Sequence, residues 1–212
     1  MARHTKEQAL ETRERILDAA VDVFYEYGVA RPSLTEVAKR AGVTRGAVYG
    51  HFENKADLFS ALCDRVRLPT EAICEADPAN CKSDPLGELR EACIFFYQQA
   101  SQNEQWSRIL GVVLHRCEIV AESGMIQQRM DEAHDRALSR LTELLQQAVD
   151  AGQLPEYLDV ARATPLLHGA LFGVLSDWLF KPEAYDLAAC AEQHVDALID
   201  MLRLSPQLRR VR

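Results

Sequence analysis

The chain has 212 residues, of which 48% are hydrophobic and 26% are charged. This composition is typical of a globular protein and excludes a disordered chain. The longest apolar stretches, such as residues 109–114, are far shorter than the roughly 20 residues of a membrane-spanning helix. The first residues contain no apolar segment of the signal-peptide type, so we expect a cytoplasmic protein with no membrane partner.

The net charge of −8 is unevenly distributed along the chain. Residues 1–55 contain nine Lys and Arg against eight Asp and Glu, whereas the remainder contains 15 against 24. Phosphate contacts are local and are screened over about 8 Å in physiological salt. The acidic total therefore does not exclude binding to DNA.

Cysteine and histidine residues form no metal-site pattern. The six cysteines include no CxxC pair and the six histidines no HxxxH pair, so we expect no metal and no cofactor. We interpret the cysteines as buried thiols. A redox-responsive regulator that uses Cys63, Cys93 or Cys117 is an alternative. A helical enzyme or small-molecule carrier is less favoured, because the sequence has no GxSxG motif, phosphate-binding loop or paired carboxylates at helical spacing.

Helical periodicity runs through the chain without β-type alternation, which predicts an all-α fold of about nine helices. The first helix is expected over residues 6–27, ended by Gly28. Its apolar stripe consists of Ile16, Ala20, Val23 and Phe24.

A run of short, capped helices follows. Ser33 and Glu36 form a capping box that opens the second helix, and Gly42 lies in the turn that ends it. Thr44 caps a third helix that ends near residue 50, and Asn54 caps a fourth. Residues 33–51 therefore predict a helix-turn-helix, within an N-terminal DNA-binding domain of residues 1–55.

The longer C-terminal domain, residues 56–212, is also expected to be helical. Its fifth helix starts after Asp84, with Pro85 in the first turn. Further helices are predicted over residues 104–119, 123–151, 159–180 and 184–204. We assign this domain to ligand binding and dimerisation.

The third helix has the pattern of a recognition helix. Leu34, Val37, Ala38 and Ala41 are expected to face inward on the preceding helix, which leaves the start of the third helix free to enter the major groove of DNA. Arg45 can then read guanine through two hydrogen bonds, and Gly46 lets the backbone approach. The remaining candidates for DNA contact, chiefly to phosphates, are Ser33, Thr44, Tyr49, His51 and Lys55.

Residues 16–59 strongly resemble the N-terminal domain of TetR-family repressors. Residues 1–17 and four later segments resemble the AcrR and TtgR branch of that family, which controls multidrug efflux pumps; these segments are residues 84–86, 115–118, 152–155 and 200–206. The resemblance implies a homodimeric repressor that binds a palindromic double-stranded operator and is released by a hydrophobic or aromatic inducer. This chain departs from the branch at Gly50, where an aromatic residue is usual.

The resemblance also implies a ligand cavity among the fifth to eighth helices and a homodimer through the last two. Candidate ligand-binding residues are Arg67, Leu89, Cys93, Phe96, Leu110, Val113, Leu114, His134, Leu138, Leu141, His168, Leu171 and Phe172. Two stripes could be dimer surface or monomer core: Leu167, Leu171, Leu175 and Trp178 with Gly169 and Gly173 alongside, and Leu187, Ala191, Val195, Leu198 and Leu202. We favour the dimer, because helix-turn-helix proteins read palindromes as two-fold dimers.

Overall fold

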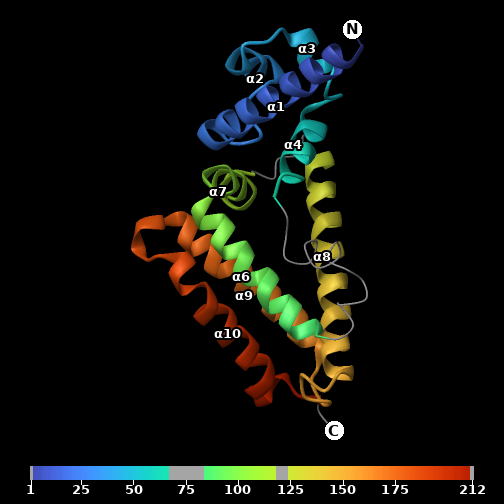
Figure 1. The fold of residues 1–212 in the computed structure, drawn as a ribbon, viewed down its shortest axis with the longest axis vertical. Helices are drawn as coiled ribbons and strands as arrows, with labels where there is room; N and C mark the ends of the chain where they lie inside the picture. The colour runs from blue at the N-terminus through green and yellow to red at the C-terminus, as the bar shows by residue number, and fades with distance from the viewer. Residues whose placement is uncertain (1, 67–83, 118–123, 211–212) are drawn as a thin grey trace. The chain divides into compact units, whose positions relative to one another are not determined.

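A computed structural model describes residues 2–66, 84–117 and 124–210 (Figure 1). The predicted all-α fold is confirmed: these residues form nine α-helices, and their only β-type pairing is an isolated bridge between Leu158 and Arg209. Within the same ranges, no helix has the length and apolar character needed to cross a membrane. Nor do the described side chains include a group of three or more His, Cys, Asp or Glu that could hold a metal ion.

The chain divides into two compact units, Met1–Val66 with Glu104–Met130 and Arg67–Asn103 with Asp131–Arg212. The units are defined by contacts within the chain. The functional boundary expected after residue 55 stays a prediction.

The first unit is built around the long helix α1 (Ala2–Tyr27), which contacts α2 (Leu34–Ala41), α4 (Lys55–Cys63) and α7 (Glu104–Gly111). The short α3 (Arg45–Tyr49) packs on α2, and a π-helical turn, η1 (Val112–Arg116), continues α7. Its core consists largely of apolar side chains that are almost fully buried, among them Ile16, Leu17, Ala20, Phe24, Val37, Val48, Phe52, Leu58, Phe59 and Leu62. This core fixes α2 and α3 on α1.

The second unit contains α6 (Pro85–Gln102), α9 (Val160–Phe180) and α10 (Leu187–Leu204), which lie side by side (Figure 1). Helix α8 (Gly124–Asp150) contributes the residues after Met130 to this unit. The fully buried Tyr97 of α6 donates a hydrogen bond from its hydroxyl to the carbonyl oxygen of Leu171 in α9, at 2.9 Å. Thr142 of α8 and Thr164 of α9 are joined by a hydroxyl–hydroxyl bond of 3.1 Å.

Three predicted helix boundaries are wrong. Helix α1 begins at Ala2 and not at residue 6. The helix expected over residues 104–119 is α-helical only to Gly111, where the π turn takes over. The last helix begins at Leu187 because Asp186 caps it, while residues 182–184 form a separate 3-10 turn.

Candidate functional site

The helix-turn-helix is held by local caps, as predicted. The backbone N–H of Ser33 donates to the Glu36 carboxylate at 2.6 Å, and the Ser33 hydroxyl accepts from the Glu36 N–H. The bonds that the Glu36 carboxylate accepts from the Ser33 N–H and hydroxyl hold the pKa of Glu36 below its ordinary value. Gly42 has a φ of 66°, a left-handed conformation that favours glycine, and ends α2. Thr44 then caps α3 by accepting from the Ala47 N–H at 3.1 Å.

The predicted recognition residues lie together on the exposed surface of α3. Thr44, Arg45, Gly46 and Tyr49 are all exposed. The Arg45 guanidinium lies 5.3 Å from the Tyr49 ring centroid and donates to its hydroxyl at 3.4 Å. At an exposed site such a cation–π contact contributes about 0.5–1 kcal/mol, which favours this orientation of Arg45 in the free protein. A planar donor held at the start of an exposed helix suits bidentate recognition of a guanine edge.

The flanking candidates are already engaged within the protein. The Ser33 hydroxyl belongs to the capping box, and the half-buried His51 packs its ring 6.4 Å from that of Phe52. The Lys55 ammonium donates to the carbonyl oxygens of Ala30 at 2.6 Å and Pro32 at 3.2 Å. A contact from any of these to phosphate stays a prediction.

Gly50 ends α3 in ordinary right-handed geometry, with φ −74° and ψ −17°. A Cβ atom there would lie 3.4 Å from the Ala47 carbonyl oxygen and 3.5 Å from that of Gly46, which is normal van der Waals contact. The backbone thus accepts a side chain, and the exposed position leaves room for a ring.

Gly50→Tyr and Gly50→Trp should therefore tighten binding to operator and random DNA alike, about threefold to fivefold. The physical reasons are new packing on the sugar-phosphate backbone and a gain in helix propensity of roughly a few tenths of a kcal/mol, because Tyr and Trp rank between Ala and Gly. Fluorescence anisotropy on both DNAs measures the effect. Gly124→Tyr is the matched control, since Gly124 is also exposed and a Cβ there has open space, but it lies at the start of α8; it should leave both affinities unchanged. Weaker binding by both Gly50 variants would show that the approach to DNA needs a small residue there.

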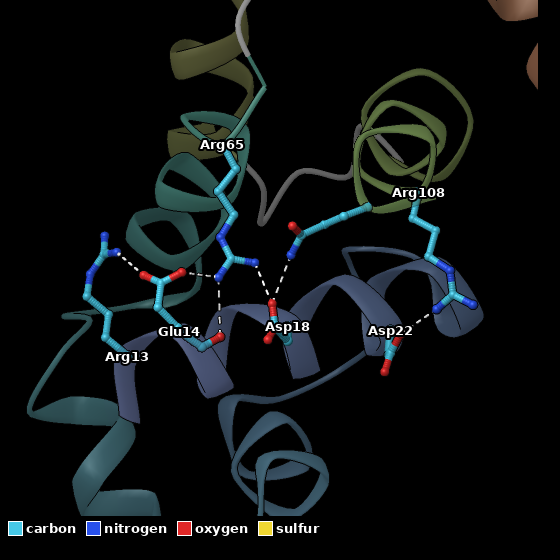
Figure 2. A network of polar contacts seen from close by, with 7 residues as sticks. Arg13, Glu14, Asp18, Asp22, Arg65 and Arg108 are labelled. Atoms are coloured by element: carbon cyan, nitrogen blue, oxygen red, sulfur yellow. Dashed lines mark hydrogen bonds and ion pairs between the residues drawn. The ribbon is translucent and has the colours of Figure 1, made fainter. Parts of the chain in front are cut away.

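A second set of contacts, which the sequence analysis missed, lies along one edge of α1 (Figure 2). Arg65, just beyond α4, donates to Asp18 at 2.7 Å and also pairs with the Glu14 carboxylate. From α7, Gln105 donates to the same Asp18 oxygen at 2.9 Å, and Arg108 donates to Asp22 at 2.6 Å. These bonds tie α1 to both α4 and α7. The sequence does contain a sign of this acidic edge: four acidic residues at i, i+4 spacing, which lie on one face of a helix, namely Glu14, Asp18, Asp22 and Glu26.

The C-terminal end of α1 makes a separate set of contacts with α7 and the π turn. Both the Arg108 and the Arg116 guanidinium lie over the Tyr25 ring, at 5.7 and 5.9 Å from its centroid. A Cβ on Gly111 would come within 3.2 Å of this ring, tighter than ordinary contact, so the ring would have to shift by a few tenths of an ångström to admit another residue. The Val29 N–H donates to the Arg116 carbonyl at 3.1 Å. The π turn is thus bonded directly to the segment that leads into α2.

In the second unit, the ligand candidates include a chain of ring contacts. The His134 and His168 centroids are 5.0 Å apart, those of His168 and Phe172 are 4.7 Å apart, and those of Phe172 and Phe96 are 5.9 Å apart. Burial, and to a smaller extent the neighbouring His134, lower the pKa of His168. At neutral pH, His168 can therefore offer a hydrogen bond to a ligand without carrying a charge.

The other ligand candidates are distributed between the two units. In the second unit, four of these candidates are almost fully buried: Leu89, Cys93, Leu141 and Leu171. A fifth candidate there, Leu138, is half-buried. Leu110, which is buried, and the half-buried Val113 and Leu114 belong to the first unit. Arg67 lies outside the described residues.

The environments of Cys93 and Cys117 argue against these two thiols as redox-active groups, whereas a redox role of the half-buried Cys63 stays untested. Burial raises the pKa of Cys93 to about 12 and also raises that of Cys117. The thiolate is the reactive form, so both groups are poor nucleophiles at neutral pH.

The two stripes assigned to the dimer surface are monomer core, so that interpretation is wrong for these residues. Leu167, Leu171, Leu175 and Trp178 are at most 7% exposed, as are Leu187, Ala191, Val195 and Leu202, while Leu198 is half-buried. The exposed face of α9 carries other apolar or small residues. Leu166 is 47% and Phe180 84% exposed, and a Cβ on Gly169 or Gly173 would have open space around it.

Comparison with known proteins gives two family matches and several full-length relatives. Residues 16–62 match bacterial regulatory proteins of the tetR family, and residues 84–204 match the C-terminal region of MAATS-type transcriptional repressors. The chain is 39% identical over 210 residues to the HTH-type transcriptional regulator TtgR of Pseudomonas putida, covering 99% of this chain and all of that one.

Solved structures show the same likeness. NalD, the secondary repressor of the MexAB-OprM multidrug efflux pump in Pseudomonas aeruginosa, superposes with a TM-score of 0.82 at 34% identity, over 93% of this chain and 99% of that one. SmeT, the repressor of the multidrug efflux pump SmeDEF of Stenotrophomonas maltophilia, was solved in complex with triclosan. In that form it gives a TM-score of 0.78 at 32% identity, over 92% and 93% of the two chains.

Proposed function

The chain belongs to the TetR family of bacterial transcriptional regulators, and from this premise we propose that it represses a multidrug efflux operon. As a homodimer it binds a palindromic operator, and hydrophobic, ring-containing compounds release it. The observation that carries the DNA-binding role is the exposed, Thr44-capped α3 with Arg45 ordered on Tyr49. This role assigns the protein to the cytoplasm, where the DNA is.

Operator recognition assigns different tasks to the residues of α3. Arg45 donates two hydrogen bonds to a guanine edge in the major groove, and Gly46 leaves room for the backbone to approach. Thr44 and Tyr49, which are exposed beside Arg45, contact phosphates and set the register. The corresponding helix of the second protomer reads the other half-site.

Selection of binding sites from random double-stranded DNA tests this role. The selected sites should share an inverted repeat, with half-site centres about 10 base pairs or a multiple of that apart. A guanine should recur at one position of each half-site, and its preference should weaken in Arg45→Ala. Selection without any two-fold symmetric sequence would contradict the proposal.

Dimerisation uses the exposed face of α9. Leu166, Gly169, Gly173 and Phe180 follow helical spacing along this face, and the glycines permit a second helix to approach closely. On α10, Leu204 is another exposed apolar side chain, at 73%. Burial of these side chains between two copies removes a hydrophobic surface from water.

The inducer is an apolar compound that contains rings, since SmeT was solved with triclosan. The rings of His134, His168 and Phe172 provide aromatic faces, with the buried Phe96 in contact with Phe172, and His168 provides a neutral polar group to orient the ligand. Release of DNA requires that the ligand bind the DNA-free conformation more tightly than the DNA-bound one.

Val113→Trp should block binding of triclosan while operator affinity and folding remain near those of the wild type. Val113, half-buried on the π turn, is one of the ligand-binding residues that the family resemblance implies, and a larger side chain at such a residue would exclude the ligand. Calorimetric titration with triclosan, thermal melting and an operator-shift assay on this variant measure the three properties. Leu144→Trp, at a fully buried position of α8, is the control and should destabilise by about 1–3 kcal/mol. An equal loss of stability in Val113→Trp, with no ligand found for the wild type, would contradict the ligand assignment.

A further inference from the structure

The carboxylate of Asp22, in the C-terminal part of α1, lies between cations from two other helices of the first unit. Its Oδ1 atom accepts a hydrogen bond of 2.6 Å from Arg108 Nη1 of α7 (Figure 2). Its Oδ2 atom lies 3.9 Å from Arg40 Nη1 of α2. One carboxylate thus joins α7 to the first helix of the helix-turn-helix, with one oxygen toward each.

Arg40 has its main partner one turn further along α1. Its Nη1 and Nη2 atoms donate to the two carboxylate oxygens of Glu26, at 2.9 and 2.7 Å. This bidentate bond is the main reason why the pKa of Glu26 lies below its ordinary value. Arg40 is the last residue but one of α2, and a turn of three residues, 42–44, leads on to α3. A displacement of Arg40 therefore reaches the turn that sets the direction of α3.

Arg108 lies on the helix that leads to the predicted ligand-binding residues of the first unit. Leu110 follows it by two positions, and Val113 and Leu114 lie on the π turn that continues α7. Arg108 is oriented within this helix by an ion pair of 3.1 Å with Glu104, one turn earlier. A ligand that displaces α7 therefore displaces the cation bonded to Asp22.

The ion pairs of Asp22 and Glu26 permit two arrangements of Arg40. In the structure, Arg108 offsets the charge of Asp22, and Arg40 is bonded to Glu26. When Arg108 withdraws, Arg40 is the cation that remains beside Asp22, and unit charges about 4 Å apart attract each other even near a protein surface. Arg40 can then turn one nitrogen toward Asp22 and keep the other on Glu26. The loss of one bond at α7 thus becomes a change in how α2 is held on α1.

We propose that Asp22 is a coupling residue, which passes a displacement of α7 on to α2 by exchanging its ion pair with Arg108 for one with Arg40. The inference rests on the ligand response proposed above and names the regulation of the same site. A wild type that binds operator but is not released by triclosan would refute that response, and this inference with it. A wild type that is released, with unaffected Asp22 variants, would refute only the inference.

The quantity to measure is the coupling factor, the ratio of the operator dissociation constants with and without saturating triclosan. A substitution that changes DNA affinity uniformly, such as the removal of one negative charge, cancels in this ratio. The side chains of Arg40, Asp22 and Arg108 are 35%, 39% and 40% exposed. Ion pairs this exposed typically change an equilibrium constant by at most about fivefold, which sets the size of the expected effect.

Asp22→Asn removes the charge and keeps the shape of the side chain. We expect its coupling factor to be about two- to fivefold smaller than that of the wild type, with unchanged affinity for triclosan in the absence of DNA. Asp22→Glu keeps the charge and should restore most of the response. Arg108→Met should lower the coupling factor as much as Asp22→Asn, and the double variant should lose no more than either alone, because both act through one bond. If Asp22→Asn does not fold, Arg108→Met carries the test.

Glu14→Gln is the matched control, because Glu14 lies on the same edge of α1 but pairs with Arg13 and Arg65, neither of which belongs to α2 or α7. It neutralises one carboxylate in the same way and should leave the coupling factor at the wild-type value. Three results would each overturn the proposal: a wild-type coupling factor in Asp22→Asn, an equal reduction in Glu14→Gln, or fully additive losses in the double variant.

Discussion

Gly173→Arg is expected to convert the proposed dimer to monomers and to weaken operator binding about a hundred- to ten-thousandfold. Two linked DNA-binding domains bind more tightly than a single domain by a factor in this range, because binding of the second domain is intramolecular. Within one chain the substitution should be tolerated, since a side chain at Gly173 enters open space and arginine favours a helix over glycine by up to about 1 kcal/mol. Light scattering gives the oligomeric state and anisotropy the operator affinity.

Gly124→Arg is the matched control for this experiment. Gly124 is also exposed, helical and surrounded by open space, but it lies at the start of α8 and not on the α9 face. It should leave both the dimer and operator binding intact. A dimeric Gly173→Arg with wild-type operator affinity would show that the exposed α9 face is not the interface.

Arg45→Ala is expected to weaken operator binding by about 1–3 kcal/mol, or roughly 5- to 150-fold, because it removes a bidentate contact to a base. Affinity for random DNA should change much less. The loss should appear only with operators that contain the guanine, because the alanine side chain has no N–H group to bond to it. Operators in which the guanine is replaced should bind the variant and the wild type equally. Titration of both DNAs at one salt concentration measures the difference.

Arg136→Ala removes the same charge from an exposed position on α8 and serves as the control. It should leave both affinities unchanged. Equal losses by Arg45→Ala on operator and random DNA would assign Arg45 to phosphate binding, and no loss would remove it from the interface.

The helix-turn-helix could be predicted from the sequence because its determinants are local. The capping box of Ser33 and Glu36, the left-handed Gly42 and the caps Thr44 and Asn54 act within four residues along the chain. Each signal fixes one helix end, and together they define the helix-turn-helix. The exposure of Arg45 and Tyr49 then follows from the helical period.

The contacts that depend on tertiary packing could not be predicted from local sequence signals. The change from α- to π-helix at Gly111 coincides with the Tyr25 ring and with the bond from Val29 to Arg116, groups more than 80 residues apart in the chain. The apolar stripe of Leu167, Leu171 and Leu175 identified a buried face but not what covers it. Periodicity does not distinguish burial by the same chain from burial by a second copy.

The measurement that tests the central claim most directly is release of a preformed operator complex by ligand. Labelled operator, bound by the wild-type protein, is titrated with a ring-containing hydrophobic compound that binds in calorimetry. We expect the anisotropy to fall at micromolar compound, and the affinity for the compound to fall by the same factor when operator is present, because coupling between two sites is reciprocal. Binding of the compound that leaves operator affinity unchanged would contradict a ligand-responsive repressor.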